Sequence, residues 1–291
     1  MSLANVLTGT VFAALVAAIA WRARALTTGG ALAAFAVGTL TFASGGVAFA
    51  EVLLAFFVPS VLLSRIGRAR KKQLVDIGKH GARDAMQVIA NGGVATVCAV
   101  AYAVTHDVRW AFAFAAAYAV ATADTWATEI GTLVRKTPLS ILTFRPVATG
   151  ISGGITLQGT LAEIAGAAWI GVVAFLAIVM PFASRLAEYG FSNGPAMAMF
   201  IAGVSPPWWR PLFAVAIGGI AGATLDSVLG ATLQELRFCE TCGRTCETDP
   251  HACGSPARLI RGVRGFSNDV VNLLAGAAGS ALAYGLLPTN H

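Results

Sequence analysis

Long apolar stretches separated by short polar segments form the dominant pattern along this 291-residue chain. A helix needs roughly 20 apolar residues to cross about 30 Å of hydrocarbon, and runs close to that length recur throughout the sequence. We predict spans at 3–20, 29–46, 47–64, 85–104, 110–133, 160–180, 208–234 and 268–287. The runs lack the alternation of a membrane barrel. The predicted fold class is therefore an all-α integral membrane protein of about eight transmembrane helices.

The composition supports this interpretation, because 56% of the residues are hydrophobic and only 12% are charged. Soluble domains are far more polar. We predict one polytopic membrane domain over residues 1–291, which includes a cytoplasmic Cys-rich loop at 235–265. The first span lacks the features of a cleaved signal, so we expect it in the mature protein. Residues 196–204 are apolar but too short to span, so we expect 184–207 to form an external loop with a hairpin or surface helix.

Basic residues concentrate in alternate loops. The loops after the first, third, fifth and seventh spans hold 17 of the 20 lysines and arginines, and the others are Arg109, Arg185 and Arg210. Because basic loops stay in the cytoplasm, both termini are predicted outside a multi-pass cell membrane protein. The net charge of +6 is then a topology signal. No base-stacking pattern accompanies it, so no nucleic-acid partner is expected.

Polar residues gather at the predicted cytoplasmic ends of several helices. The candidates are Arg83, Asp84, Gln87, Asn91, Asp124, Thr125, Thr128, Glu129, Asp226, Ser227, Asn268, Asp269 and Asn272. Arg83, Gln87 and Asn91 share one helical face, since they are spaced four residues apart. Asp124 and Asp226 lie inside apolar runs, where an ionised carboxylate is costly unless it is paired or hydrated. One polar site at this membrane face is therefore predicted.

Three polar residues, Asn268, Asp269 and Glu163, have a simpler interpretation as helix caps. Asn268 and Asp269 are ordinary residues for a helix start, and capping alone would explain one of them. Glu163 follows Thr160 with the spacing of a capping box, which predicts a helix start at that point. We therefore expect Glu163 to act as a cap.

A Gly-rich segment precedes the sixth span. Ser152, Gly153 and Gly154 lie just before a predicted helix, where backbone N–H groups could bind a phosphate. Such stretches also form plain turns. Lys136 and Arg145 lie nearby in the sequence, and carboxylates, basic residues and a Gly-rich turn together are typical of sites for metal–phosphate complexes.

Four of the five cysteines lie in the Cys-rich loop, in the pattern Cys239-x2-Cys242-x3-Cys246 followed by His251-x-Cys253. Disulfides are disfavoured in the cytoplasm, so zinc or an iron–sulfur cluster is the better interpretation. We favour Cys239, Cys242, His251 and Cys253 as ligands of a structural zinc ion, with Cys246 as a competitor. Simple reduced thiols are the alternative.

Several motifs in order resemble one integral membrane family. They are RDAMQVIANGG, ADTWATEIGTL, FRPVATGISGGITLQGT, ATLDSVLGATLQ, the Cys-rich loop and GFSNDVVNLLAG. The resemblance, from about residue 25 to residue 287, is to the family that includes the plant phytyl-phosphate kinase and animal transmembrane protein 19. A more distant similarity is to CTP-dependent phytol and dolichol kinases.

The resemblance implies an enzyme that phosphorylates a prenyl (phytyl-like) monophosphate to the diphosphate with CTP and Mg²⁺. The expected partners are this lipid, the nucleotide and membrane lipids. On this hypothesis the magnesium ligands are Asp124, Glu129, Asp226 and Asp269. Substrate and phosphate contacts are expected from Lys79, Arg83, Gln87, Asn91, Thr128, Arg145, Ser152, Gly153, Gly154, Asn268 and Asn272.

Two other functions fit the same residues. A lipid or ion transporter could use the intramembrane carboxylates for coupling, although it should show a polar path to both faces. A cytidylyl-type transferase acting on lipid phosphates would share the metal and phosphate sites.

Overall fold

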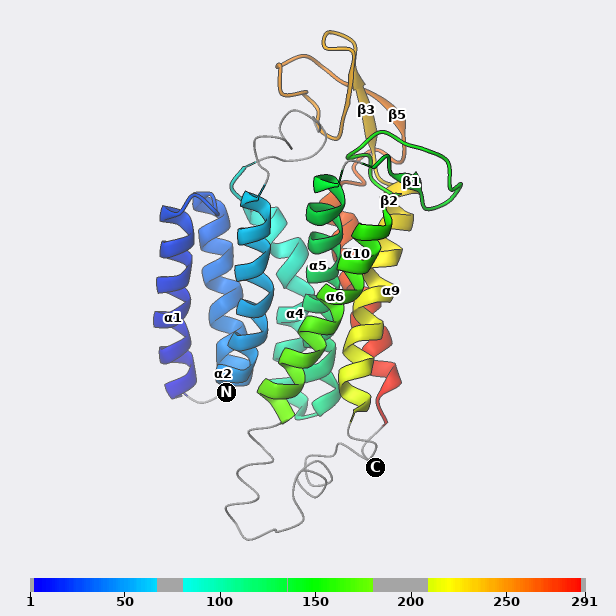
Figure 1. Cartoon of the computed structure of the whole chain (residues 1–291). Helices are drawn as coiled ribbons and strands as arrows, with labels where there is room; N and C mark the ends of the chain where they lie inside the picture. The colour runs from blue at the N-terminus through cyan, green and yellow to red at the C-terminus, as the bar shows by residue number, and fades with distance from the viewer. Residues whose placement is uncertain (1–2, 67–80, 135, 180–208, 289–291) are drawn as a thin grey trace.

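The computed structural model describes residues 3–66, 81–134, 136–179 and 209–288 of the chain. It is a bundle of long helices that carries small β-sheets at one end (Figure 1). The helices are α1 (Leu3–Arg22), α2 (Thr28–Arg65), α4 (Ala85–Thr105), α5 (Val108–Leu133), α6 (Leu157–Ala174), α9 (Arg210–Thr232) and α10 (Asn268–Leu286). A π-helical turn, Phe175–Val179, extends α6.

Helix α2 folds back on itself at Gly46, where the sequence predicts the boundary between two spans. Gly46 has φ 64° and ψ −146°, a conformation that glycine adopts without a Cβ clash. Arg65 donates a hydrogen bond from Nη2 to the carbonyl of Ala23 at 2.8 Å, so both ends of α2 lie at the same end of the bundle (Figure 1). In the described part of the chain, six helices are long and apolar enough to span a membrane. With α2 doubled and α5 at the centre, the prediction of about eight helices is confirmed.

Helix α5 forms the centre of the bundle. Every residue from Ala111 to Ala123 is buried, as expected for a helix that is surrounded by others. Its small alanines let α9 approach closely: a Cβ added at Gly219 would lie 2.7 Å from the Cβ of Ala119. Small residues of this kind allow membrane helices to pack backbone against backbone.

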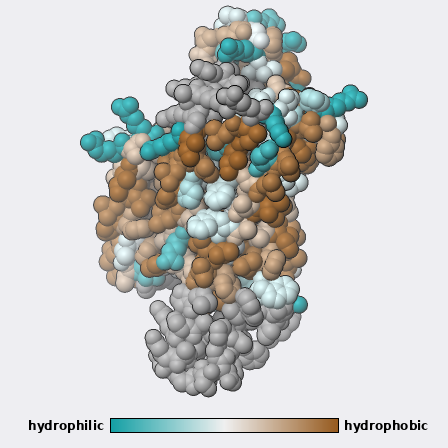
Figure 2. All heavy atoms as spheres, in the orientation of Figure 1, coloured by the Kyte–Doolittle hydropathy of each residue, from teal (hydrophilic) through white to brown (hydrophobic). Residues whose placement is uncertain are grey.

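The outer surface of the bundle is apolar. Val97 and Val104 on α4 are 68% and 73% exposed, as expected for side chains that face lipid. Figure 2 shows this apolar surface, with hydrophilic side chains concentrated toward the end that carries the β-sheets.

The Cys-rich segment folds into a three-stranded antiparallel sheet, although the sequence pattern predicts only a loop. Strand β3 (Leu236–Cys239) lies between β4 (Arg244–Cys246) and β5 (Arg258–Arg261). We call residues 236–261 the Cys-rich module. A second, two-stranded sheet pairs β1 (Leu139–Ser140) with β2 (Gly154–Ile155), directly before α6.

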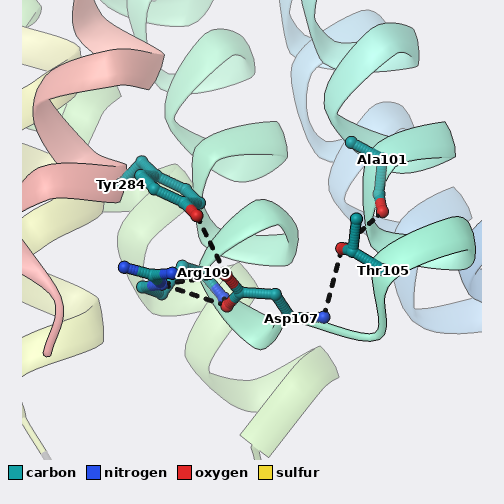
Figure 3. A network of polar contacts seen from close by, with 5 residues as sticks. All are labelled: Ala101, Thr105, Asp107, Arg109 and Tyr284. Carbon is teal, nitrogen blue, oxygen red and sulfur yellow. Dashed lines mark hydrogen bonds and ion pairs between the residues drawn. The ribbon is translucent and has the colours of Figure 1, made fainter. Parts of the chain in front are cut away.

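At the opposite end of the bundle, a polar network surrounds Asp107, which caps the start of α5 (Figure 3). Arg109 Nη2 donates to Asp107 Oδ2 at 2.7 Å, and the Tyr284 hydroxyl donates to the same oxygen at 2.9 Å. The network therefore joins α5 to the end of α10, far along α5 from Asp124.

The start of the sixth span differs from the prediction. Helix α6 begins at Leu157, and the cap is Thr156, whose hydroxyl accepts a hydrogen bond from the Gly159 N–H at 3.0 Å. The predicted capping box of Thr160 and Glu163 is therefore wrong, because both residues lie inside the helix. The predicted external segment 184–207 lies outside the described residues.

Candidate functional site

Four helices meet around a cavity that contains polar residues from each of them. Its empty space is about 280 Å³, including the part that is open to the surroundings, and its polar walls are Asn91 of α4, Asp124 of α5, Asp226 of α9 and Asn272 of α10. The remaining wall residues are apolar or glycine. We call this space the acidic cavity. The structure thus brings two of the four predicted magnesium ligands together with two of the predicted amide side chains.

Two oxygen atoms at the acidic cavity lack hydrogen-bond partners. Asp226 Oδ2 and Asn272 Oδ1 are both buried, and neither finds a donor among the described residues. Buried polar atoms are normally satisfied, because leaving one unpaired costs about 1–3 kcal/mol. Both atoms are acceptors, so a cation or an N–H or O–H donor would satisfy them. Carboxylate and amide oxygens are the ligands that magnesium takes in proteins. The donor set therefore fits the predicted ion.

A third acid, Glu163, lies beside the two aspartates. Its side chain is buried, with 8% exposure, and Oε1 accepts a hydrogen bond from the Thr224 hydroxyl at 3.0 Å. The charge of Glu163 acts on both Asp124 and Asp226. The sequence does not indicate this role for Glu163, because Thr160 and Glu163 have the spacing of a capping box. The available signal was that the apolar run already begins at Leu157, which leaves Glu163 nearly two turns inside the helix.

The other two predicted magnesium ligands lie farther out. The charge of Glu129, on the last turns of α5, acts on Asp124, but Glu129 does not line the acidic cavity. Asp269 is buried in the first turn of α10, and that helix contributes Asn272 and Gly276 to the cavity instead. The N-cap of α10 is Ser267, so capping does not explain Asn268.

The predicted common helical face holds for Gln87 and Asn91, whereas Arg83 precedes α4, which begins at Ala85. All three line a second, larger cavity between α1, α2 and α4. Gln87 also completes a capping box, because its Oε1 accepts from the Asp84 N–H at 3.0 Å and its N–H donates to Asp84 Oδ1 at 2.9 Å. Its side chain therefore has a structural role at the start of α4.

The Gly-rich turn lies where the sequence predicts, directly before α6. Some of its polar groups already form hydrogen bonds within the protein. The Gly154 N–H donates to the Ile151 carbonyl at 3.1 Å, and the Ser152 hydroxyl donates to Glu247 Oε1 at 2.5 Å. Thr128 and Arg145 are exposed, and the structure does not bring them to the acidic cavity. Lys79 lies outside the described residues.

The Cys-rich module is attached to this turn. Besides the Ser152–Glu247 contact, Arg261 Nη2 donates to the Gly230 carbonyl at 2.9 Å, at the end of α9. Burial raises the pKa of Glu247 above its ordinary value. The charge of Glu247 also acts on Asp226, so the module lies close to the acidic cavity. Glu247 cannot be recognised from the sequence, because an acid in a polar loop gives no signal.

The four favoured zinc ligands come together in the Cys-rich module. The ligand atoms of Cys239, Cys242, His251 and Cys253 all lie within 4.8 Å of one another. The sulfurs of Cys239 and Cys253 are 3.7 Å apart. Tetrahedral zinc with bonds of about 2.3 Å would place two sulfurs about 3.8 Å apart. The arrangement therefore fits a zinc ion.

Two further observations bear on this cluster. The competing Cys246 lies outside it and contacts the Thr248 carbonyl through its sulfur at 3.4 Å. A hydrogen bond with His251 lowers the pKa of the Cys253 thiol to about 5, whereas the hydrogen bond with Cys253 raises the pKa of Cys242, so without a metal ion the cluster favours a thiolate at Cys253.

The helical bundle, its lipid-facing surface and the acidic cavity define a multi-pass integral membrane protein with a polar site inside the bundle. Residues 11–280 match the model of the family described as "Integral membrane protein DUF92", and the chain belongs to this family.

Two curated relatives are plant proteins. Protein PGR of Arabidopsis thaliana is 28% identical over 280 residues, which cover 91% of this chain and 90% of PGR. Chloroplastic protein VTE6 of the same plant is 29% identical over 181 residues, which cover 57% of this chain and 54% of VTE6. An uncharacterized membrane protein of Methanocaldococcus jannaschii is 32% identical over 157 residues, 53% of this chain and 64% of the relative. No solved structure matches the chain.

Proposed function

We propose that this protein transfers a phosphoryl group from CTP to a prenyl monophosphate at the cytoplasmic membrane face, giving a prenyl diphosphate and CDP. The observation that carries the proposal is the convergence of Asp124, Asp226 and Asn272 on one cavity inside an apolar bundle. Such residues are costly in a membrane unless a cation or a polar ligand joins them.

The chemistry needs positioning more than covalent catalysis. An oxygen of the acceptor phosphate attacks the γ-phosphorus of CTP, and the bond from that phosphorus to the β-bridging oxygen breaks. Magnesium, when bound, neutralises the charge of the phosphates. Asp124, Asp226 and Asn272 would hold the ion, with Glu163 beside them, and Arg83 would bind the acceptor phosphate. The acceptor is already an adequate nucleophile, so no general base is required.

Three further observations support the proposal. The motifs resemble those of the family that includes the plant phytyl-phosphate kinase, which indicates the substrate class. The structure places the chain segments that follow α1, α5 and α9 at one end of the bundle, together with both ends of α2 (Figure 1). These segments carry most of the basic residues, which favours the cytoplasm for that end and hence access to nucleotide.

The test is label transfer with the purified full-length protein in lipid nanodiscs. CTP labelled with ³²P at the γ-position should give a labelled prenyl diphosphate in the presence of magnesium, whereas CTP labelled at the α-position should not. Transfer of the α-label would identify a cytidylyl-type transferase instead. If folded protein transfers neither label and also uses neither ATP nor GTP, the proposal is wrong.

A further inference from the structure

The larger cavity lies between α1, both halves of α2 and the start of α4, and Tyr118 of α5 closes one side. Its empty space is about 790 Å³, including the part that is open to the surroundings. Most of the lining side chains are apolar, among them Phe12, Val16, Ala34, Val37, Phe42 and Leu53. We call this space the apolar cavity.

The polar side chains among the described lining residues are Arg83, just before α4, Gln87 and Asn91 of α4, and the hydroxyl-bearing Tyr118 of α5. Arg83 is the charged one. The Arg83 guanidinium lies over the Phe56 ring, 5.8 Å from its centroid. Within the described chain, no carboxylate oxygen forms a salt bridge with it, although the charge of Glu129 acts on it. A cation at the end of an apolar chamber is complementary to a molecule with an anionic head and a hydrocarbon tail.

We infer that the apolar cavity binds the isoprenoid chain of the lipid phosphate, with the phosphate at Arg83. The identity of the lipid as a prenyl monophosphate rests on the proposed function, whereas the binding of an anionic lipid rests on the cavity itself. Arginine suits this role because its planar guanidinium pairs with two phosphate oxygens at once.

Asn91 lies between the apolar cavity and the acidic cavity. It lines both the apolar cavity and the acidic cavity, and its Nδ2 donates to the Gln87 carbonyl at 2.8 Å. Asn91 lies about two helical turns along the chain from Arg83, so it marks the place where the two cavities share a wall.

The depth of the apolar cavity limits how much of the chain it holds. On α1 the lining runs from Phe12 to Ala20. At a rise of about 1.5 Å per residue this is about 12 Å, less than half of the roughly 30 Å hydrocarbon layer. The isoprene units nearest the phosphate would bind inside, and the rest of a long chain would extend into the bilayer. Affinity should rise with the first few isoprene units and then level off.

A pair of alanines on α2 provides a matched test. Ala34 lines the apolar cavity, whereas Ala36, two residues further on, is exposed on the outer surface. Ala34→Phe would fill the space that the chain needs, and Ala36→Phe adds the same ring where only bulk lipid lies. The probe is geranylgeranyl monophosphate with a diazirine in the second isoprene unit, crosslinked to the full-length protein in phosphatidylcholine nanodiscs without nucleotide.

The inference predicts that crosslinks map to α1, α2 and α4 at the apolar cavity. Ala34→Phe and Arg83→Gln should each weaken binding by about tenfold or more, equivalent to about 1.4 kcal/mol, while Ala36→Phe leaves it unchanged. Unlabelled geranylgeranyl monophosphate should compete far better than geranylgeraniol. Equal labelling of the two phenylalanine variants, or competition by phosphatidylglycerol as strong as by the prenyl phosphate, would overturn it. This assay measures binding and no turnover, so specific binding here combined with no transfer in the ³²P-CTP assay would reject the kinase and keep the lipid site.

Discussion

At the residue scale, the acidic cavity brings several carboxylates close together inside an apolar bundle. Asp124, Asp226 and Glu163 come from three helices, and their charges act on one another inside an apolar bundle. Like charges that are buried together destabilise a fold unless a cation or protons neutralise them. The proposed cation site would account for both their convergence and the unpaired oxygen of Asp226.

The cysteine cluster gives a prediction with an internal control. Cys242→Ser should remove zinc from the purified protein, because it deletes one of four clustered ligands. Cys246→Ser should keep the metal, since Cys246 lies outside the cluster although it belongs to the same module. The measurement is elemental analysis of protein purified without chelators, and about one zinc per chain is expected for the wild type. Equal zinc content in both variants would contradict the assignment.

Acids inside long apolar runs can be recognised from the sequence. An acid whose neighbours match another motif, such as a helix cap, is assigned the wrong role. Asp124 and Asp226 stand out inside long apolar runs, and both line the acidic cavity. The spacing of Thr160 and Glu163 predicts a cap, although Glu163 lies inside α6. Nearness in sequence predicts Arg145 at the site, yet Arg145 lies on an exposed loop. Proximity along the chain does not determine which loops fold back over the bundle.

At the scale of elements, the Gly-rich turn packs against α9 and joins the Cys-rich module to the bundle. Gly153 has φ 82°, and a Cβ at this position would lie 2.4 Å from the Cβ of Ala231. Gly230 of α9 approaches the same turn, where its added Cβ would be 3.2 Å from the Cβ of Ser152. These close approaches explain why glycines occur here, independently of any contact with phosphate.

Replacing glycines in two different surroundings tests this packing. Gly153→Ala should destabilise the protein more than Gly243→Ala, which also has a positive φ, of 64°, but no atom within 4 Å of the added Cβ. The left-handed conformation alone costs about 1–2 kcal/mol, and overpacking adds about 1–3 kcal/mol at Gly153 only. Thermal unfolding in detergent, followed by tryptophan fluorescence, measures the difference. Equal melting temperatures for the two variants would show that the turn does not pack tightly on α9.

The helices could be predicted because hydrocarbon thickness sets their length, and the break at Gly46 falls where two spans were expected. The sheet of the Cys-rich module could not, because its strands are only three or four residues long and metal ligands interrupt any pattern. The apolar cavity also has no sequence signal. It depends on how α1, α2 and α4 pack, and lining residues are the same alanines, valines and phenylalanines that face lipid elsewhere.

At the scale of the whole molecule, the two ends of the bundle differ in charge and in chemistry. One end carries the basic segments, the Gly-rich turn and the Cys-rich module, and the other carries the Asp107 network (Figures 1 and 3). Between them, α5 is buried from Ala111 to Ala123. The polar groups that we assign to catalysis therefore belong to the basic end.

Orientation in the membrane can be measured with two matched substitutions. Thr143 is exposed at the basic end and Thr105 at the opposite end. In a background with the native cysteines replaced, Thr143→Cys should be protected from an impermeant thiol reagent in intact cells, and Thr105→Cys should be labelled, because basic segments stay in the cytoplasm. Permeabilisation should make both positions reactive. The reverse pattern in intact cells would place the acidic cavity near the outer face, away from nucleotide.

The most direct test of the central claim compares one chemical change at two places on the same helix. Asp124→Asn removes a carboxylate at the acidic cavity, and Asp107→Asn removes one at the far end of α5. Transfer of the γ-phosphate from CTP to a prenyl monophosphate is measured at saturating magnesium for equal amounts of folded protein. We predict a loss of about a hundredfold or more for Asp124→Asn, and wild-type turnover within a few fold for Asp107→Asn. Near-normal transfer by the Asp124 variant would contradict the account.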